Sequence, residues 1–108
     1  MLFNSFDIRD NTMKRYHIIY EGIVQGVGFR WKLIMIARSL NLTGYAKNLN
    51  NGNVEVEVQG REESLNEFIK KSLEKDHFVQ IYDYAIKDVE LKEKETIFDV
   101  IYWIDTSQ

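Results

Sequence analysis

The residues best suited to chemistry form a single run, residues 22–30 (GIVQGVGFR), which contains three glycines and one arginine. The run follows a short apolar segment and leads into residues 29–40, which have helical spacing. The first turn of a helix has N–H groups without intrahelical partners and carries the positive end of the helix dipole. Glycines let an oxyanion approach the backbone closely, and Arg30 adds a permanent positive charge. The run therefore predicts a phosphate site.

A second polar run, residues 44–54 (GYAKNLNNGNV), follows further along the chain and is closed by Gly60. The first run resembles the first signature of the acylphosphatases, and this one resembles the second. The two runs have the family's order and a similar separation, and the resemblance covers about residues 15–104. It implies hydrolysis of the carboxyl-phosphate bond of an acyl phosphate to a carboxylate and inorganic phosphate, without a metal or cofactor.

The resemblance also assigns roles to particular residues. Arg30 matches the catalytic arginine, and Asn48 matches the catalytic asparagine, with water attacking phosphorus directly. Because an amide cannot act as a base, Asn48 can only orient this water. That help suffices because the leaving carboxylate has a low pKa and needs no general acid. The backbone N–H groups expected to bind phosphate are those of Gln25, Gly26, Val27, Gly28, Phe29 and Arg30.

Hydrophobic periodicity predicts how the chain positions these two runs. Valines and glutamates alternate from residue 54 to residue 58, and Asn51-Gly52 before them is a two-residue hairpin signal. Asn41 is a candidate left-handed cap for the first helix. The expected elements are a strand at 15–21, a helix at 29–40, strands at 45–49 and 54–58, a helix at 62–75, a bulged strand within 79–91 and a last strand at 97–104. This order predicts an α+β fold, a ferredoxin-like βαββαβ sandwich with two helices on one face of an antiparallel sheet and a short extra C-terminal strand.

Length and composition set the class of protein. The 108 residues suit one domain, residues 14–108, preceded by a flexible extension, residues 1–13. The chain has no cysteine, which excludes a disulfide framework, and its start lacks the pattern of a signal peptide, so we expect a cytoplasmic protein. No apolar run approaches the roughly 20 residues of a membrane helix. Asp and Glu (17) outnumber Lys and Arg (14), which argues against nucleic-acid binding. We expect a monomer whose partners are an acyl phosphate and inorganic phosphate.

Other conspicuous residues have simpler interpretations. His17 and His77 are too isolated in sequence to indicate a metal site. Trp31, beside Arg30, either narrows the mouth of the site or covers the first helix, and we favour the second interpretation. A non-catalytic phosphate-binding regulatory module is the alternative function, but such a module has no need of Asn48. An RNA-recognition module is disfavoured because residues 54–58 lack aromatic and basic side chains.

Overall fold

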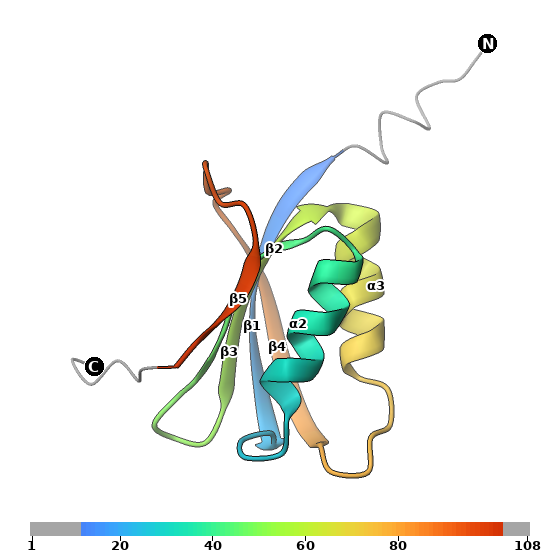
Figure 1. Ribbon diagram of the computed structural model, residues 1–108, viewed down its shortest axis with the longest axis vertical. Helices are drawn as coiled ribbons and strands as arrows, with labels where there is room; N and C mark the ends of the chain where they lie inside the picture. Colours follow the sequence, from blue (N-terminus) through green and yellow to red (C-terminus); the bar gives the residue numbers. More distant parts are fainter. Residues whose placement is uncertain (1–11, 103–108) are drawn as a thin grey trace.

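The computed structural model describes residues 12–102 and has two layers, a five-stranded sheet and a pair of helices that cover one face of it (Figure 1). The helices are α2 (Phe29–Ser39) and α3 (Glu62–Ser72), and the strands are β1 (Met13–Ile23), β2 (Thr43–Asn48), β3 (Val54–Arg61), β4 (Gln80–Val89) and β5 (Phe98–Ile101). The strand order is β4-β1-β3-β2-β5. The first four strands pair antiparallel, and β5 pairs parallel with β2. The ferredoxin-like prediction is confirmed, and the extra strand makes the sheet mixed.

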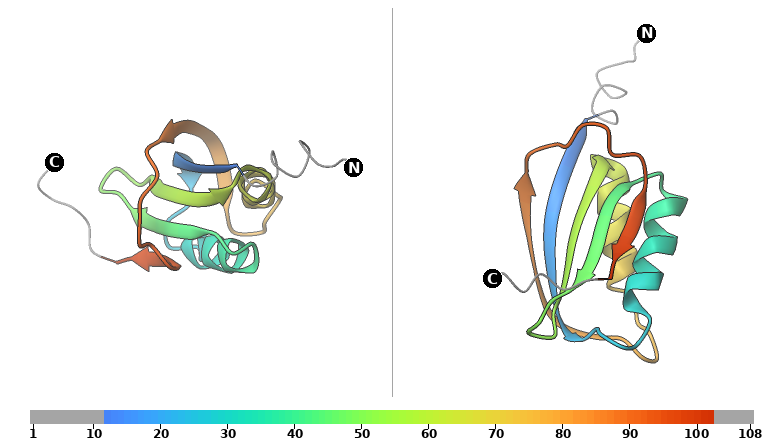
Figure 2. Two further views of the ribbon diagram at one scale, coloured as in Figure 1. Left: turned by 90° about the horizontal axis from the view of Figure 1, so that it is seen from above. Right: turned by 60° about the vertical axis from the view of Figure 1, so that its left-hand side comes forward.

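The core lies between the sheet and the helices, and it follows from the alternation of apolar residues in the two central strands. Tyr16, Ile18 and Tyr20 of β1 lie opposite Val58, Val56 and Val54 of β3, and all six are buried. Side chains at helical spacing cover this surface from α2 and α3, among them Phe29, Leu33, Ala37, Leu65 and Phe68. Figure 2 shows the same two layers from two further directions. The burial of these apolar faces fixes the register in which β1 leads into the connection at residues 24–28.

The left-handed cap predicted for the end of α2 is confirmed at Asn41. Asn41 has a φ of 57°, and its N–H donates to the carbonyl oxygen of Arg38 at 3.2 Å. The N–H of Leu42 donates to the carbonyl oxygen of Ala37 at 2.9 Å, so the two bonds satisfy the last carbonyls of the helix. The helix ends at Ser39 and α3 ends at Ser72, slightly earlier than expected.

The predicted hairpin between β2 and β3 is confirmed, but the prediction that its turn has two residues is wrong. The N–H of Leu49 donates to the carbonyl oxygen of Asn53 at 2.9 Å, and the N–H of Gly52 donates to that of Leu49 at 3.2 Å. Only Gly52 takes a positive φ, of 94°. The extra loop residue places Asn48 as the last residue of β2, directly opposite Val54.

The bulge predicted for the fourth strand is confirmed. Glu21 lies opposite Asp83, whereas Gly22 lies opposite Ile81, so β4 has one extra residue at this point. Gly22 has a φ of 141°, and a Cβ on it would lie 2.1 Å from the carbonyl oxygen of Gln80. Only glycine allows this approach, because such a contact is far shorter than van der Waals distance. The bulge increases the local twist where β1 leads into the loop.

The ends of the described chain differ in detail from the expected elements. Strand β5 is shorter than the expected strand at 97–104, and Trp103 and Ile104 lie outside the described residues. Strand β1 begins at Met13, which pairs with Arg61, and residues 1–11 of the expected extension also lie outside the described part. Within residues 12–102 no helix is long and apolar enough to span a membrane.

Three connections meet at one end of the molecule, the lower end in Figure 1. They are residues 24–28 between β1 and α2, residues 49–53 between β2 and β3, and residues 73–79 between α3 and β4. The fold therefore brings the two polar runs of the sequence to the same end of the sheet.

Candidate active site

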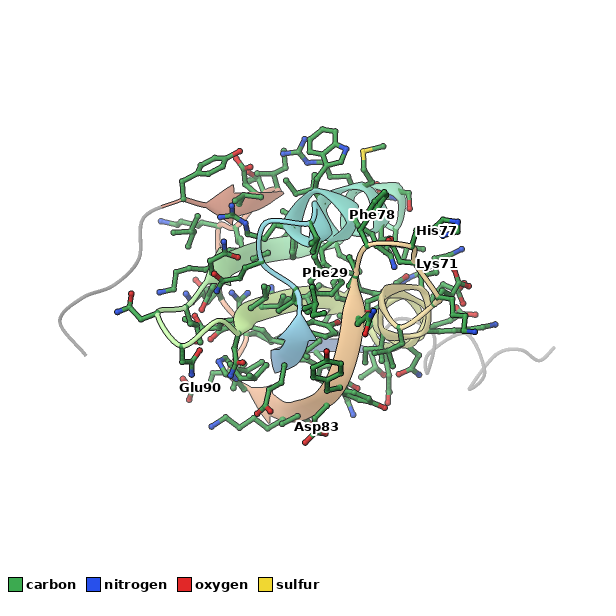
Figure 3. All side chains as sticks on the ribbon, turned by 90° about the horizontal axis from the view of Figure 1, so that it is seen from below. Phe29, Lys71, His77, Phe78, Asp83 and Glu90 are labelled. Carbon is green, nitrogen blue, oxygen red and sulfur yellow. The ribbon has the colours of Figure 1, made fainter. Side chains whose placement is uncertain are left out.

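The loop between β1 and α2 is anchored to the hydrophobic core by Phe29, the first residue of the helix. Its ring packs edge-on against Tyr20, with centroids 5.0 Å apart and planes at 85°, and the hydroxyl of Tyr20 donates to Ser72 Oγ at 2.7 Å. Figure 3 shows Phe29 in the interior, next to the start of α2. Gly26 and Gly28 have φ values of 74° and 80°, which glycine adopts without strain. This anchor fixes the start of α2 against the core.

The N-terminus of α2 has no cap. No side chain bonds to it, and its first turn contains no acidic residue. The first helical bond runs from the N–H of Lys32 to the carbonyl oxygen of Gly28 at 3.0 Å, and the N–H groups of residues 25–31 donate to no acceptor within residues 12–102. Helix α3, by contrast, has Glu62 and Glu63 in its first turn. The unpaired donors and the dipole of α2 together favour an anion at this helix.

The half-buried side chain of Arg30 is held by the end of β5. Its Nη1 donates to the carbonyl oxygen of Ile101 at 3.2 Å, and its Cζ lies 5.3 Å from the centre of the Tyr102 ring, within the range of a cation–π contact. None of the ion pairs among the described residues includes Arg30. Its charge is therefore not neutralised by a carboxylate and remains available to an anion.

Asn48 reaches the same end of the sheet through the pairing of β2 with β5. Lys47 lies opposite Ile101, whose carbonyl oxygen accepts the hydrogen bond from Arg30. Asn48 is the next residue along β2. The Oδ1 atom of Asn48 is buried and accepts no hydrogen bond from the described residues. A buried acceptor without a donor costs about 1–3 kcal/mol, so this oxygen is suited to a donor such as water.

The side chain of Gln25 joins the two polar runs, a role that the sequence did not reveal. Its Nε2 donates to the carbonyl oxygens of Leu49 and Asn53, both at 2.8 Å. Only the backbone N–H of Gln25 was predicted to take part in the site. The bonds span 24 and 28 residues of sequence, so no local pattern indicates them. They fix the loop before α2 against the hairpin that carries Asn48.

A pocket of about 240 Å³ opens at the start of α2. It is lined by Val24, Gly26, Gly28, Phe29, Arg30, Trp31, Val100 and Tyr102. Four of the predicted site residues thus share one pocket, whereas Gln25, Val27 and Asn48 are not part of its lining. Trp31 also lines the pocket and is 62% exposed, which favours the alternative that it borders the mouth of the site over the preferred interpretation that it merely covers the helix.

Other polar groups belong to structural contacts or to a separate surface. His17 Nε2 lies 2.9 Å from Glu55 Oε2 on the face of the sheet away from the helices. A larger pocket, of about 690 Å³, is lined by residues 73–77 and 79–82 and contains none of the predicted site residues. Among residues 12–102 no three His, Asp or Glu side chains gather in a group that could hold a metal ion.

Comparison with known proteins gives a consistent set of similarities. The family model described as acylphosphatase matches residues 16–100. The acylphosphatase of Clostridium beijerinckii is 40% identical over 90 residues, which are 83% of this chain and all of the relative. That of Geobacillus kaustophilus is 39% identical over 90 residues, 83% of this chain and 96% of the relative. The crystal structure of acylphosphatase from Bacillus subtilis is 32% identical with a TM-score of 0.78, covering 84% of this chain and all of that one. The matched region includes both polar runs.

Proposed function

Because this chain belongs to the acylphosphatase family and is a hydrolase of acyl phosphates, we propose that its reaction takes place at the N-terminus of α2. The phosphoryl oxygens bind to the backbone N–H groups of residues 25–30 and to the guanidinium of Arg30. The observation that carries this assignment is the uncapped start of α2, whose unpaired donors adjoin an arginine without a carboxylate partner. Substrates of the family are small acyl phosphates, which suit a pocket of about 240 Å³.

Arg30 stabilises the transferring phosphoryl group. In phosphoryl transfer, negative charge is spread over three equatorial oxygens, and fixed positive charge around them lowers the barrier. The hydrogen bond to Ile101 and the ring of Tyr102 hold the guanidinium in place before the substrate arrives. Less reorganisation is therefore needed when the charge develops.

Asn48 orients the water that attacks phosphorus. Its buried Oδ1 has no partner among the described residues and can accept one hydrogen bond from that water. The oxygen of the water forms the new bond to phosphorus as the bond to the carboxyl oxygen breaks. The carboxylate leaves with the electron pair of that bond, and the protons of the water pass to phosphate and solvent. No protein side chain needs to act as a base or an acid in this scheme, and neither a metal nor a cofactor is required.

The test is hydrolysis of benzoyl phosphate by the purified chain in water labelled with ¹⁸O. Attack on phosphorus places one labelled oxygen in the phosphate and none in the benzoate, and a chelator leaves the rate unchanged. Label in the benzoate would contradict attack on phosphorus. Loss of activity that added metal restores would contradict the metal-free scheme. A chain that binds phosphate without hydrolysing acyl phosphates would instead be an anion-binding module.

A further inference from the structure

From the pocket beside Arg30 we infer that Trp31 and Tyr102 bind the acyl part of the substrate, and that the preferred substrates carry a compact, apolar acyl group such as an aromatic ring. This inference rests on the proposed function, because it concerns the half of the substrate that leaves as a carboxylate. Once the phosphoryl group occupies the N-terminus of α2, the rest of the molecule must extend along the remaining walls of the pocket.

The remaining walls are apolar. Val24 and Val100 line the pocket together with the rings of Trp31 and Tyr102, and Arg30 is the only charged residue of the described part of the chain that lines it. Val24 is buried, whereas Trp31 is 62% and Tyr102 is 79% exposed, so the aromatic residues form the outer part of the pocket. Ligand sites commonly combine apolar walls with a few polar groups that fix orientation.

Trp31 and Arg30 are neighbours in the first turn of α2, and this spacing suits the two halves of an acyl phosphate. Phe29 points into the core, Arg30 reaches the end of β5, and Trp31 remains at the surface beside the pocket. Tyr102 directly follows β5, and the centre of its ring lies 5.3 Å from the Cζ atom of Arg30. An aromatic acyl group bound here would cover the exposed rings, which interact favourably with another ring.

Among residues 12–102, no carboxylate or lysine lines this pocket, so a charged acyl group would find no partner there other than Arg30. Two basic residues further along α2 already have partners: Lys32 Nζ lies 3.7 Å from Asp76 Oδ2, and Arg38 Nη2 lies 3.6 Å from Asp99 Oδ1. A second carboxylate on the substrate would compete with the phosphoryl group for Arg30. The volume, about 240 Å³, lies below the roughly 300–1,000 Å³ of sites for drug-sized ligands, which favours a small acyl group.

The test compares kcat/KM for benzoyl phosphate, acetyl phosphate and succinyl phosphate, whose acyl groups are aromatic, minimal and negatively charged. We expect the unchanged protein to prefer benzoyl over succinyl phosphate by about tenfold or more. In Trp31→Ala, the ratio of kcat/KM for benzoyl to acetyl phosphate should fall about tenfold, and Trp31→Phe should restore most of it. Comparing this ratio between variants cancels the difference in intrinsic reactivity of the two substrates.

Met35→Ala is the matched control, because Met35 is 56% exposed one turn further along α2 and does not line the pocket. It should leave the ratio unchanged. Competitive inhibition by inorganic phosphate should be alike in all these variants, since Trp31 contacts only the acyl group. A Trp31→Ala protein that loses activity equally on benzoyl and acetyl phosphate would overturn the inference and leave the proposed function intact. Folded protein that hydrolyses none of the three substrates would overturn both.

Discussion

The guanidinium of Arg30 donates a hydrogen bond of 3.2 Å to the carbonyl oxygen of Ile101, the last residue of β5. This bond depends on the short parallel pairing of β5 with β2, because Ile101 is opposite Lys47 in that register. Strand β5, at the edge of the sheet, thus positions Arg30 next to β2, the strand that ends at Asn48.

Arg30→Ala should remove phosphate binding and turnover together, because in the proposed mechanism the guanidinium contacts the phosphoryl group both in the ground state and in the transition state. We expect kcat/KM to fall at least about 100-fold and inhibition by inorganic phosphate to become undetectable. Arg38→Ala is the matched control, since Arg38 lies on the same helix and its Nε donates to the carbonyl oxygen of Phe98 in β5 at 3.0 Å. Steady-state kinetics with an acyl phosphate would measure both. Unchanged turnover in Arg30→Ala would reject the assigned role.

Asn48→Ala should depress kcat strongly, by about 100-fold or more, while the affinity for inorganic phosphate stays within about twofold. In the proposed mechanism the carboxamide orients the attacking water and does not touch the phosphoryl group. Asn50→Ala in the adjoining exposed loop should change neither quantity. If Asn48→Ala instead abolished phosphate binding and retained kcat, the side chain of Asn48 would bind phosphate and would not orient the water.

Gln25→Glu should weaken the contact between the loop before α2 and the β2–β3 hairpin, because a carboxylate cannot donate to the carbonyl oxygens of Leu49 and Asn53. Loss of these two bonds should lower the free energy of unfolding by about 1–3 kcal/mol. It should also weaken phosphate binding by about tenfold, since the loop that carries the N–H groups of residues 25–30 loses its support and the new carboxylate repels the anion. Urea denaturation and phosphate inhibition measure the two effects separately. Full stability with full phosphate affinity would show that the link is dispensable.

Glu95 should make the stability of the fold depend on pH in the acid range. Burial disfavours its charged form, but hydrogen bonds from Arg15 and Thr43 outweigh this cost and hold its pKa below the ordinary value of 4.5. A lowered pKa in the folded state stabilises the protein above pH 4.5, and the contribution is lost as the pH falls through the folded value. Denaturation at a series of pH values should therefore show that the free energy of unfolding falls less steeply on acidification in Glu95→Gln than in the unchanged protein.

Exposed Glu90 provides the control for that titration. Its substitution by Gln should leave the acid branch of the stability curve as it is. An acid branch of equal slope in the unchanged protein and in Glu95→Gln would contradict the assignment to Glu95.

Local patterns predicted the elements of the fold because each pattern reports a physical constraint on neighbouring residues. The alternation of valine and glutamate in β3 requires a strand with one buried face and one solvent-exposed face. Asparagine is one of the few residue types that readily adopt the left-handed conformation, as Asn41 does. The glycine run predicted the loop, although the hairpin turn proved longer than the Asn51-Gly52 signal suggests. A signal from two residues cannot fix how many neighbours join the turn.

The contacts that complete the candidate site could not be read from local pattern. Gln25 bonds to residues 24 and 28 positions away, and Arg30 to one 71 positions away. Tyr102 reaches the pocket only because β5 joins the far edge of the sheet in a parallel register. These relationships depend on strand order, which no local pattern specifies. The roles of Arg30 and Asn48 came from the family resemblance, and their catalytic function stays a prediction.

The most direct measurement of the central claim is a titration of the ¹⁵N-labelled protein with inorganic phosphate, followed through its backbone amide resonances. Binding at the N-terminus of α2 predicts saturable shifts in the amides of residues 25–30 and in the side-chain N–H signals of Arg30. The amides of Glu62 and Glu63, at the acidic start of α3, should stay where they are. Saturable shifts elsewhere, with residues 25–30 unmoved, would contradict the account.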